Sequence, residues 1–328
     1  MDAQLQDTVG PTDTDPALRV LVGVDGSPAS LTALRWAMRW ALVRGAEVSV
    51  LAAYPTVAAW SSPDSVGPGA LDVVRDDTRA RARAALDAVR DGDAAVRDVP
   101  VSLHVEPGPA AAQLVRRSAD ADLLVVGSRG HGEVRSALLG SVALHSVSAA
   151  ECPVVVVPLP GRWTEPGAAA RVVVGVDGSA RSAAALTAAM TEAGPAGSVT
   201  AVRAHDVTDP WGDASGPQAA AALQQVHEGA LRVMGDQLGE LLVTSAGDHP
   251  DVRRLSLTGP AGAVLVEQAA DADLLVVASR GRGEFRGLVF GSVALHCVVH
   301  APCPVLVVRP AVRQLPDRSP LVHAASAR

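Results

Sequence analysis

Short apolar runs alternate with longer amphipathic stretches along most of this 328-residue chain. The apolar runs, such as the valine-rich 154–157, are short and bounded by turn residues, which is typical of buried strands. The stretches between them carry apolar residues at helical spacing. In the first half this pattern predicts strands at 20–24, 47–54, 101–105, 123–126 and 154–157. It predicts helices at 29–44, 71–90, 110–119 and 140–149, with a loop at 61–69.

An internal repeat organises the chain. Three stretches of the first half return in the second: RVLVGVDGSPAS (19–30, then RVVVGVDGSARS at 171–182), ADADLLVV (119–126, then 270–277) and GSVALH (140–145, then 291–296). The offset is 152 residues in the first stretch and 151 in the other two, so the copies differ by one net deletion. A period this long indicates two whole domains in tandem rather than a solenoid. The second copy is expected to have strands near 172–176, 199–204, 253–257, 274–277 and 305–308.

Alternating strands and helices imply right-handed crossovers and a parallel sheet. We therefore expect an α/β chain of two tandem doubly wound domains, each a five-stranded parallel sheet with helices on both faces. Ligands of such sheets bind beyond the carboxyl ends of the strands, where the strand order reverses. If the first and fourth strands are neighbours, Asp25 faces the loop that follows Gly127. The domains are expected at 18–159 (copy one) and 171–310 (copy two), with a disordered N-terminus at 1–17, a flexible linker at 160–170 and a flexible tail at 311–328.

Composition excludes several classes of function. The net charge of −7 argues against nucleic-acid binding driven by positive charge, and no apolar run is long enough to cross a bilayer. The acidic N-terminus lacks the layout of a signal peptide, so a cytoplasmic location is expected. The chain has no lysine, which rules out both a Walker-type phosphate lysine and a lysine Schiff base. The chain has three cysteines, Cys152, Cys297 and Cys303. They are expected to be small buried residues, and a redox switch is the alternative.

The stretch GSRGHGEVRSALLGS at 127–141 returns as ASRGRGEFRGLVFGS at 278–292. Gly130 allows a positive φ or a close approach to a ligand. Gly140 and Ser141 open a helix, whose free N–H groups and positive dipole end attract phosphate. The alternatives remain open here. Glycines are common where chains turn, and Asp25 can simply begin a turn. Ser141 is by default an N-cap. The loop side chains of Arg129, His131 and Arg135 can simply be solvated.

The first-strand GVDGS, the fourth strand leading into G-x2-G-x9-G-S, and the final Cys-Pro-Val-Val-Val together resemble the universal stress protein family. The similarity covers residues 18–159 and 170–310, and the chain looks like a tandem, actinobacterial-type member. It implies a Rossmann-like fold of the adenine nucleotide alpha hydrolase type, with ATP as the ligand and magnesium present in some members. It also implies a stress-linked regulator rather than a high-turnover enzyme.

The resemblance also implies a set of nucleotide-binding residues. In copy one these are Asp25, Gly26, Ala53, Gly127, Arg129, Gly130, Gly140, Ser141 and Val142. In copy two they are Asp177, Gly178, Ala204, Ala278, Arg280, Gly281, Gly291, Ser292 and Val293. No catalytic residue and no protein metal ligand are assigned.

Two departures from the family pattern weaken the expected binding. Ala278 stands where the motif's first glycine belongs, and an alanine there clashes if its φ is positive. Both copies also have alanine after Gly-Ser-Val, at Ala143 and Ala294, where a hydroxyl residue often stands. Single-domain members pair through the last strand, so we expect either an intramolecular pseudo-dimer joining 154–157 to 305–308 or a homodimer of chains.

Three functions compete. The leading one is an ATP-binding regulator in stress or dormancy adaptation that acts on an unknown protein partner, without a nucleic acid or a membrane. The second is a slow ATPase in which Asp25 binds magnesium and His131 or Glu133 lies near the phosphates. The third is a nucleotide-free pairing scaffold. A flavin or electron-transfer role finds no specific support in the residues.

Overall fold

The computed structural model describes residues 18–55, 69–130, 139–159, 166–167, 169–205, 217–244, 248–279 and 291–309. Its first half comprises β1 (Arg19–Gly23), α1 (Pro28–Arg44), β2 (Glu47–Tyr54), α2 (Ala70–Gly92), the 3-10 turn η3 (Ala94–Val96), β3 (Val101–Pro107), α3 (Ala110–Ser118), β4 (Leu123–Gly127), α4 (Ser141–Ala149) and β5 (Val154–Val157). The second half comprises β6 (Arg171–Gly175), α5 (Ala180–Ala193), β7 (Ser198–His205), α6 (Pro217–Thr244), β8 (Asp251–Thr258), α7 (Ala261–Gln268), β9 (Leu274–Ala278), α8 (Ser292–His300) and β10 (Val305–Val308).

The strands and helices predicted from the hydrophobic pattern are present, with ends that shift by up to two residues. Shifts of two residues occur at the start of β8, which begins at Asp251 rather than near residue 253, and at the ends of β3 and α2. Predictions for 1–17, 61–68, 160–165 and 311–328 lie outside the described residues.

All ten strands form one sheet in the order β3-β2-β1-β4-β5-β10-β9-β6-β7-β8. Within each half the strands are parallel, and β1 lies between β2 and β4. The predicted adjacency of the first and fourth strands is therefore confirmed, and it recurs in the second half, where β6 pairs with β9. The strand order reverses between β1 and β4, which is where doubly wound sheets bind ligands.

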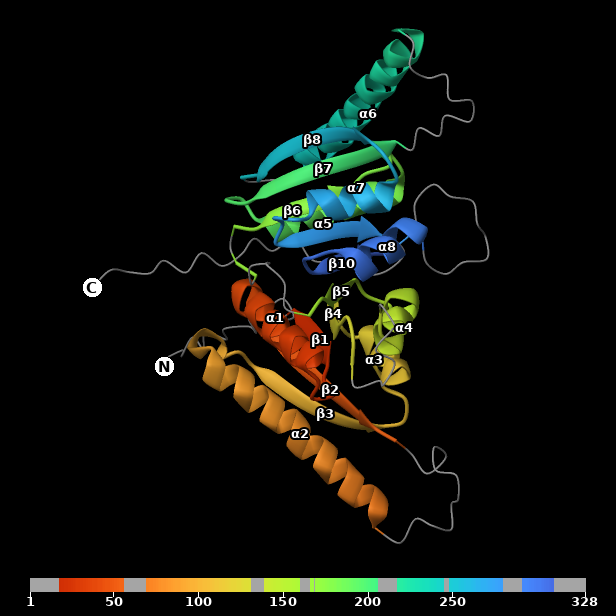
Figure 1. The fold of residues 1–328 in the computed structure, drawn as a ribbon. Coiled ribbons are helices and arrows are strands. Elements are labelled where there is room, and N and C mark those ends of the chain that lie inside the picture. The colour runs from red at the N-terminus through yellow and green to blue at the C-terminus, as the bar shows by residue number, and fades with distance from the viewer. Residues whose placement is uncertain are drawn as a thin grey trace, which may run out of the picture.

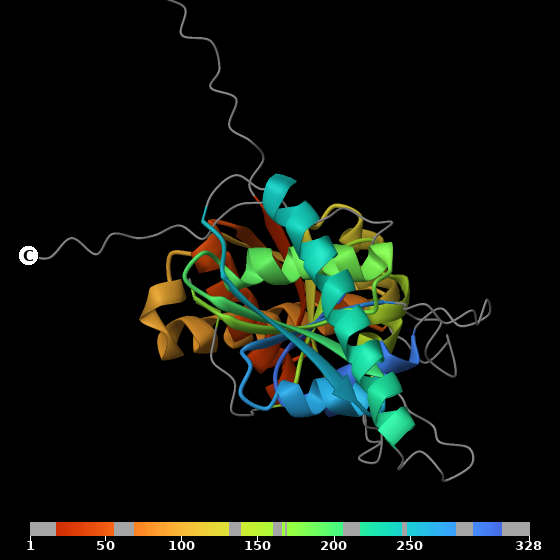
Figure 2. The same ribbon diagram turned by 90° about the horizontal axis from the view of Figure 1, so that it is seen from above.

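Helices cover both faces of the sheet (Figures 1 and 2). One face packs against α1, α2, α5 and α6 in a core that is continuous through both halves. The other packs against α3, α4, α7 and α8 in a second core. Because both faces are covered, the central strands consist of apolar residues throughout, as in the fully buried run of β5.

The two halves join through their last strands. β5 and β10 pair in antiparallel fashion, with Leu306 opposite Val155. The predicted intramolecular pairing of 154–157 with 305–308 is thus what the structure shows, while a homodimer of chains stays a prediction. Figure 1 shows the resulting elongated stack, with β8 and β3 toward its two ends.

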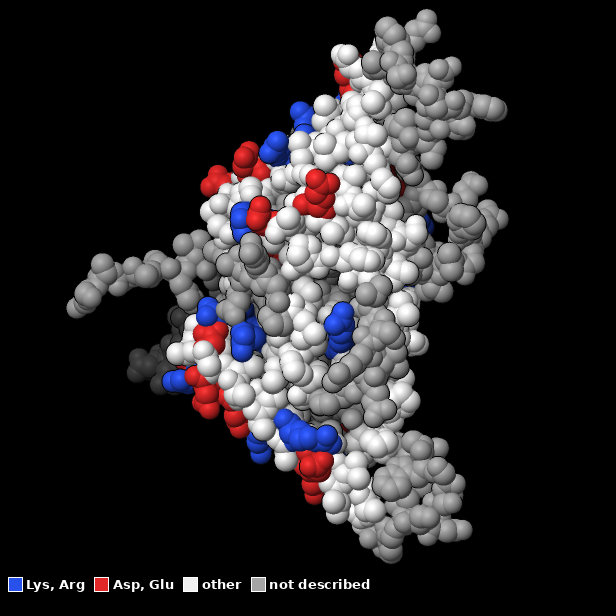
Figure 3. Space-filling model, viewed as in Figure 1, with Lys and Arg blue, Asp and Glu red and all other residues white. Residues whose placement is uncertain are grey.

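No helix among the described residues is both long and apolar enough to cross a membrane. On the face drawn in Figure 3, arginine and acidic side chains of both signs are interspersed, with much uncharged surface between them.

Candidate functional site

The turn after β1 is built by its own side chains. Gly26 has φ of 86°, in the left-handed region where glycine is favoured. The Asp25 Oδ1 atom accepts from the Ser27 N–H at 2.9 Å, and the Gly26 N–H donates to Ser30 Oγ at 3.1 Å. Ser27 then caps α1 by accepting from the Ser30 N–H at 3.2 Å. Asp25 therefore does begin a turn, and its turn contacts hold the carboxylate in a fixed place at the carboxyl end of β1.

The glycine loop meets this turn, as the strand adjacency predicted. A Cβ placed on Gly130 would lie 2.7 Å from the Asp25 Oδ2 atom. Gly130 does not have a positive φ, so a side chain there would meet the end of Asp25 and not a backbone restriction. The Gly140 N–H donates to the Ser128 carbonyl at 2.8 Å, which brings the end of the loop back to its start.

Gly127 has a different physical role. A Cβ there would lie 2.7 Å from both the carbonyl carbon and the carbonyl oxygen of Ala29. These are backbone atoms of α1, so they cannot move away as a flexible side chain can. Gly127 thus lets the end of β4 pack directly against the first turn of α1.

The start of α4 presents unpaired amides beside the loop. Gly140 is the N-cap and makes no side-chain cap bond, while Ser141 is the first helical residue. The default interpretation of Ser141 as the N-cap is therefore wrong, because the chain enters the helix one residue earlier. The Leu144 N–H donates to the Gly140 carbonyl as the first helical bond, so the amides from Ser141 to Ala143 have no helical acceptor. The hydroxyl of Ser141 is exposed and does not cap the helix.

A cavity of about 210 Å³ opens beside Asp25, between the strand ends and α2. It is lined by Val24, Asp25, Ala52, Ala53, Thr78, Arg81 and Ala82. Two of the predicted residues, Asp25 and Ala53, therefore share one cavity. The sequence analysis did not find its α2 wall, although Thr78 and Ala82 lie on the buried helical face that continues to Leu86 and Val89.

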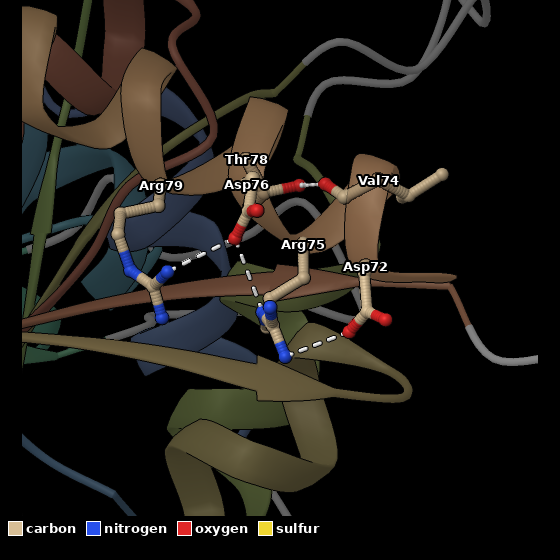
Figure 4. Close-up of polar contacts among 6 residues, drawn as sticks. All are labelled: Asp72, Val74, Arg75, Asp76, Thr78 and Arg79. Atoms are coloured by element: carbon tan, nitrogen blue, oxygen red, sulfur yellow. Dashed lines mark hydrogen bonds and ion pairs between the residues drawn. The ribbon is translucent and has the colours of Figure 1, made fainter. Parts of the chain in front are cut away.

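The first turns of α2 are held by ion pairs on the outer surface (Figure 4). Arg75 pairs with Asp72 at 2.9 Å and with Asp76 at 3.2 Å, and Arg79 pairs with Asp76 at 3.0 Å. Hydrogen bonding to Asp76, followed by the charges of Asp76 and Asp72, raises the pKa of Arg75. Thr78 instead turns its hydroxyl to the Val74 carbonyl at 2.8 Å, on the helix itself.

Copy two repeats the backbone of this site. Gly178 has φ of 82°, and Asp177 Oδ1 accepts from the Ser179 N–H at 2.9 Å. The Gly291 N–H donates to the Ser279 carbonyl at 2.9 Å, and α8 begins at Ser292, followed by Val293. Of the predicted residues of copy two, Arg280 and Gly281 lie outside the described part of the chain, as do His131, Glu133 and Arg135 of copy one.

Ala278 meets no backbone penalty, since none of the described non-glycine residues has a positive φ. The expected clash through φ therefore does not arise. Its side chain packs against the core that α5 shares, so copy two accommodates a methyl group at the position of Gly127.

The side chain that most distinguishes copy two is Arg203. Gly23 is paired with Leu51 and Gly175 with Val202, so Ala52 and Arg203 are equivalent positions one residue further along β2 and β7. Ala52 is 3% exposed and lines the cavity of copy one. Arg203 Nη1 is buried and has no hydrogen-bond partner among the described residues. Arg203 is half-buried and stands at the strand position that corresponds to the cavity-lining Ala52 of copy one.

Beside Arg203 lies a hydrogen-bonded group that sequence analysis missed. His205 Nε2 is 3.1 Å from Ser256 Oγ, and the same oxygen is 2.7 Å from His227 Nδ1. His227 Nε2 is 3.3 Å from Thr258 Oγ1. Burial, followed by the charge of Arg203, lowers the pKa of His205. Copy one has no counterpart, because Val105 and Pro107 stand at the positions of Ser256 and Thr258.

Comparison with known proteins agrees with this architecture. The sequence model of the universal stress protein family matches residues 17–158 and again 169–309. Universal stress protein Rv2623 of Mycobacterium tuberculosis is 35% identical over 303 residues, which cover 89% of this chain and 97% of that protein. A universal stress protein of Mycolicibacterium smegmatis is 32% identical over 295 residues, covering 89% and 97% of the two chains.

Among solved structures, a universal stress protein from Archaeoglobus fulgidus shares the fold, with a TM-score of 0.62 at 20% identity over 89% of this chain and 96% of that one. The doubled match, the shared fold and the extent of the mycobacterial similarity give one conclusion. The chain belongs to the universal stress protein family and carries two copies of the family's domain in tandem.

Proposed function

We propose that this protein is an ATP-binding regulator whose copy one holds the nucleotide, and that bound ATP biases its choice of protein partner during stress or dormancy. The observation that supports this proposal is the cavity beside Asp25, whose carboxylate also faces Gly130 at the start of the glycine loop. The ends of β1 and β2 and the helix α2 line this cavity, and the strand order reverses between β1 and β4.

The residues of this site suit the parts of ATP. The cavity between Asp25 and Ala53 would take the base and ribose, with the Asp25 carboxylate accepting from hydroxyl groups. Gly130 would let the sugar and first phosphate approach the backbone, because any side chain there would fill that space. The amides of Ser141 and Val142 and the guanidinium of Arg129 would bind the phosphates.

Magnesium, if it accompanies ATP, is expected to be bound mainly by the phosphates. No group of three or more histidine, cysteine, aspartate or glutamate side chains in the described residues could hold a metal ion. What such an ion supplies is neutralisation of phosphate charge. Asp25 is the carboxylate at this site that could assist it.

We further propose that copy two binds ATP much more weakly than copy one. Arg203 replaces the cavity-lining Ala52 with a much larger, charged side chain, and Ala278 adds a methyl group where β4 has Gly127. A stoichiometry near one ATP per chain follows.

The test is to purify the protein without added nucleotide, denature it, and count the nucleotide released, followed by calorimetric titration of stripped protein with magnesium-ATP. Near one ATP per chain supports the proposal, near two shows that both copies bind, and none in either assay refutes it. Ala52→Arg should abolish the site in copy one. Arg203→Ala, its matched counterpart, should add binding in copy two.

Gly130→Ala provides a control for the location of the site. Its Cβ would displace only the end of the Asp25 side chain, so the fold should persist while ATP binding weakens. Formation of ADP is measured in the same samples. Turnover that persists through further purification and disappears in Gly140→Ala would assign an ATPase activity instead of a purely regulatory role.

A further inference from the structure

The junction of the two halves has a two-fold symmetry that the side chains break. Leu306 lies opposite Val155, and the repeat offset of 151 residues makes these two equivalent positions. A pair of equivalent residues in contact marks the axis of a symmetric interface. The tandem chain therefore pairs its two copies in the way that two identical domains would pair.

A second contact on this axis involves α1 and α5. The early offset of 152 residues makes Trp40 equivalent to Glu192. Trp40 Nε1–H donates to Glu192 Oε2 at 2.9 Å. In a symmetric dimer the two partners at this position would be identical. Here one is a donor and the other is an acceptor.

Arg44 completes this contact from one side only. Its Nη2 lies 3.3 Å from Glu192 Oε2 and donates to the Thr191 carbonyl at 2.7 Å, and its guanidinium lies 5.6 Å from the centre of the Trp40 ring. The side chains of Arg44 and Glu192 are 4% and 7% exposed, so both charges are buried. Copy two has no counterpart of Arg44, because α5 ends at Ala193 and the turn at 194–197 carries no charged residue.

A third contact is also one-sided. Arg309 follows β10 and donates to the carbonyls of Ser148 and Ala150, both at 2.6 Å, at the C-terminal end of α4. A cation suits the negative end of a helix. The equivalent residue in copy one is Pro158, which has no side-chain donor.

We infer that this interface accepts copy one only against copy two, and that Glu192 is the residue that prevents copy two from pairing with itself. Copy two against copy two would place two Glu192 carboxylates together, with no arginine in the turn after α5 to neutralise them. Copy one against copy one would remove the Glu192 carboxylate from each Arg44 and would lose both Arg309 contacts. The first arrangement brings like charges together in a buried place and the second breaks a buried ion pair, and both are strongly unfavourable.

This specificity fixes the arrangement of the two nucleotide-site regions. On the proposed function, every particle then combines one site that binds ATP with one that binds it weakly. The last strands of the two copies pair within one chain, so replacing one half by a second copy of the other would break the contact between Arg44 and Glu192.

The test uses the full chain with a protease site in place of residues 160–165, cleaved after folding, and native mass spectrometry of the nicked protein after incubation. In the wild type, every particle should still contain one copy-one half and one copy-two half. In nicked Glu192→Gln, which removes the charge and keeps the shape, particles made of two copy-two halves should appear. Random pairing in the wild type, or an unchanged pattern in Glu192→Gln, would overturn the inference.

A charge exchange gives an independent readout. Trp40→Glu places a second carboxylate against Glu192 and should weaken association of the nicked halves about tenfold or more. Trp40→Glu combined with Glu192→Trp restores one donor and one acceptor, with the carboxylate of residue 40 one helical turn from Arg44, and should recover most of the association. A double variant as weak as the single one would show that the contact is merely structural. Exchange of the exposed pair Arg19 and Glu47 serves as the control and should change nothing.

Discussion

Replacing Gly127 with alanine tests whether this glycine is required by packing. At a position without a positive φ, Gly→Ala normally stabilises a protein by about 0.4–1 kcal/mol, because the unfolded chain loses freedom. Here the new Cβ would lie 2.7 Å from two backbone atoms of Ala29. Overpacking of this kind costs about 1–3 kcal/mol. The clash therefore outweighs the entropic gain, and we expect a net loss of about 1–2 kcal/mol.

Urea unfolding and thermal unfolding measure this change. A loss of this size lowers Tm by about 2–8 °C, at about 2–4 °C per kcal/mol for a unit of this length. The urea midpoint should fall while the slope stays constant, since the surface exposed on unfolding does not change. The matched substitution Ala278→Gly in copy two should also destabilise, by about 0.5–1 kcal/mol, because that site already accommodates the methyl group.

The sign of the effect decides between the two explanations. If Gly127→Ala raises stability, the close approach of β4 to α1 is not a constraint, and the glycine must be explained by a ligand. A stable Gly127→Ala variant with weakened ATP binding would support that explanation directly.

Three further predictions follow from individual side chains. Arg203→Ala should raise the ATP stoichiometry measured by calorimetry from near one toward two, and an unchanged value would show that Arg203 does not close copy two. Hydrogen bonding to Arg117 lowers the pKa of Glu106 below its ordinary 4.5, so its contribution to stability is present above that value and lost as pH falls through the folded-state pKa. Glu106→Gln should therefore differ from wild type in urea midpoint at pH 7 and converge with it in acid; a constant difference would refute the ion pair. Burial raises the pKa of the thiols of Cys152, Cys297 and Cys303 to about 12. Ellman's reagent should therefore react with these thiols at about pH 8 only after the chain unfolds. Rapid reaction of the folded chain would instead support a redox role.

Much of this protein is determined by local sequence. Valine-rich runs too short for helices define the strands, and the 3.6-residue spacing of apolar positions defines the helices. The repeat identifies two domains without reference to any contact. The turn at Asp25 and Gly26 is also local, because Gly26 supplies the left-handed φ and Ser27 and Ser30 supply the hydrogen bonds within five residues.

Other features depend on contacts that no local pattern encodes. The sequence pattern singled out Gly127 and Gly130 but not the atoms that lie next to them. A side chain at residue 127 would meet the backbone of Ala29, and one at residue 130 would meet the carboxylate of Asp25. The α2 wall of the cavity depends on how a helix some 50 residues beyond β1 packs over the strand ends. The burial of Arg203 Nη1 likewise depends on tertiary packing, because no local pattern marks this arginine for burial.

The junction shows this division most clearly. The sequence determined that the last strands of the two copies were equivalent and could pair, but it left pairing within a chain and pairing between chains equally open. Tertiary structure decided the matter, because a pairing within the chain brings Trp40, Arg44 and Glu192 together from positions about 150 residues apart. Long-range contacts of this kind depend on how helices and strands pack against one another, and that packing exists only in the folded chain.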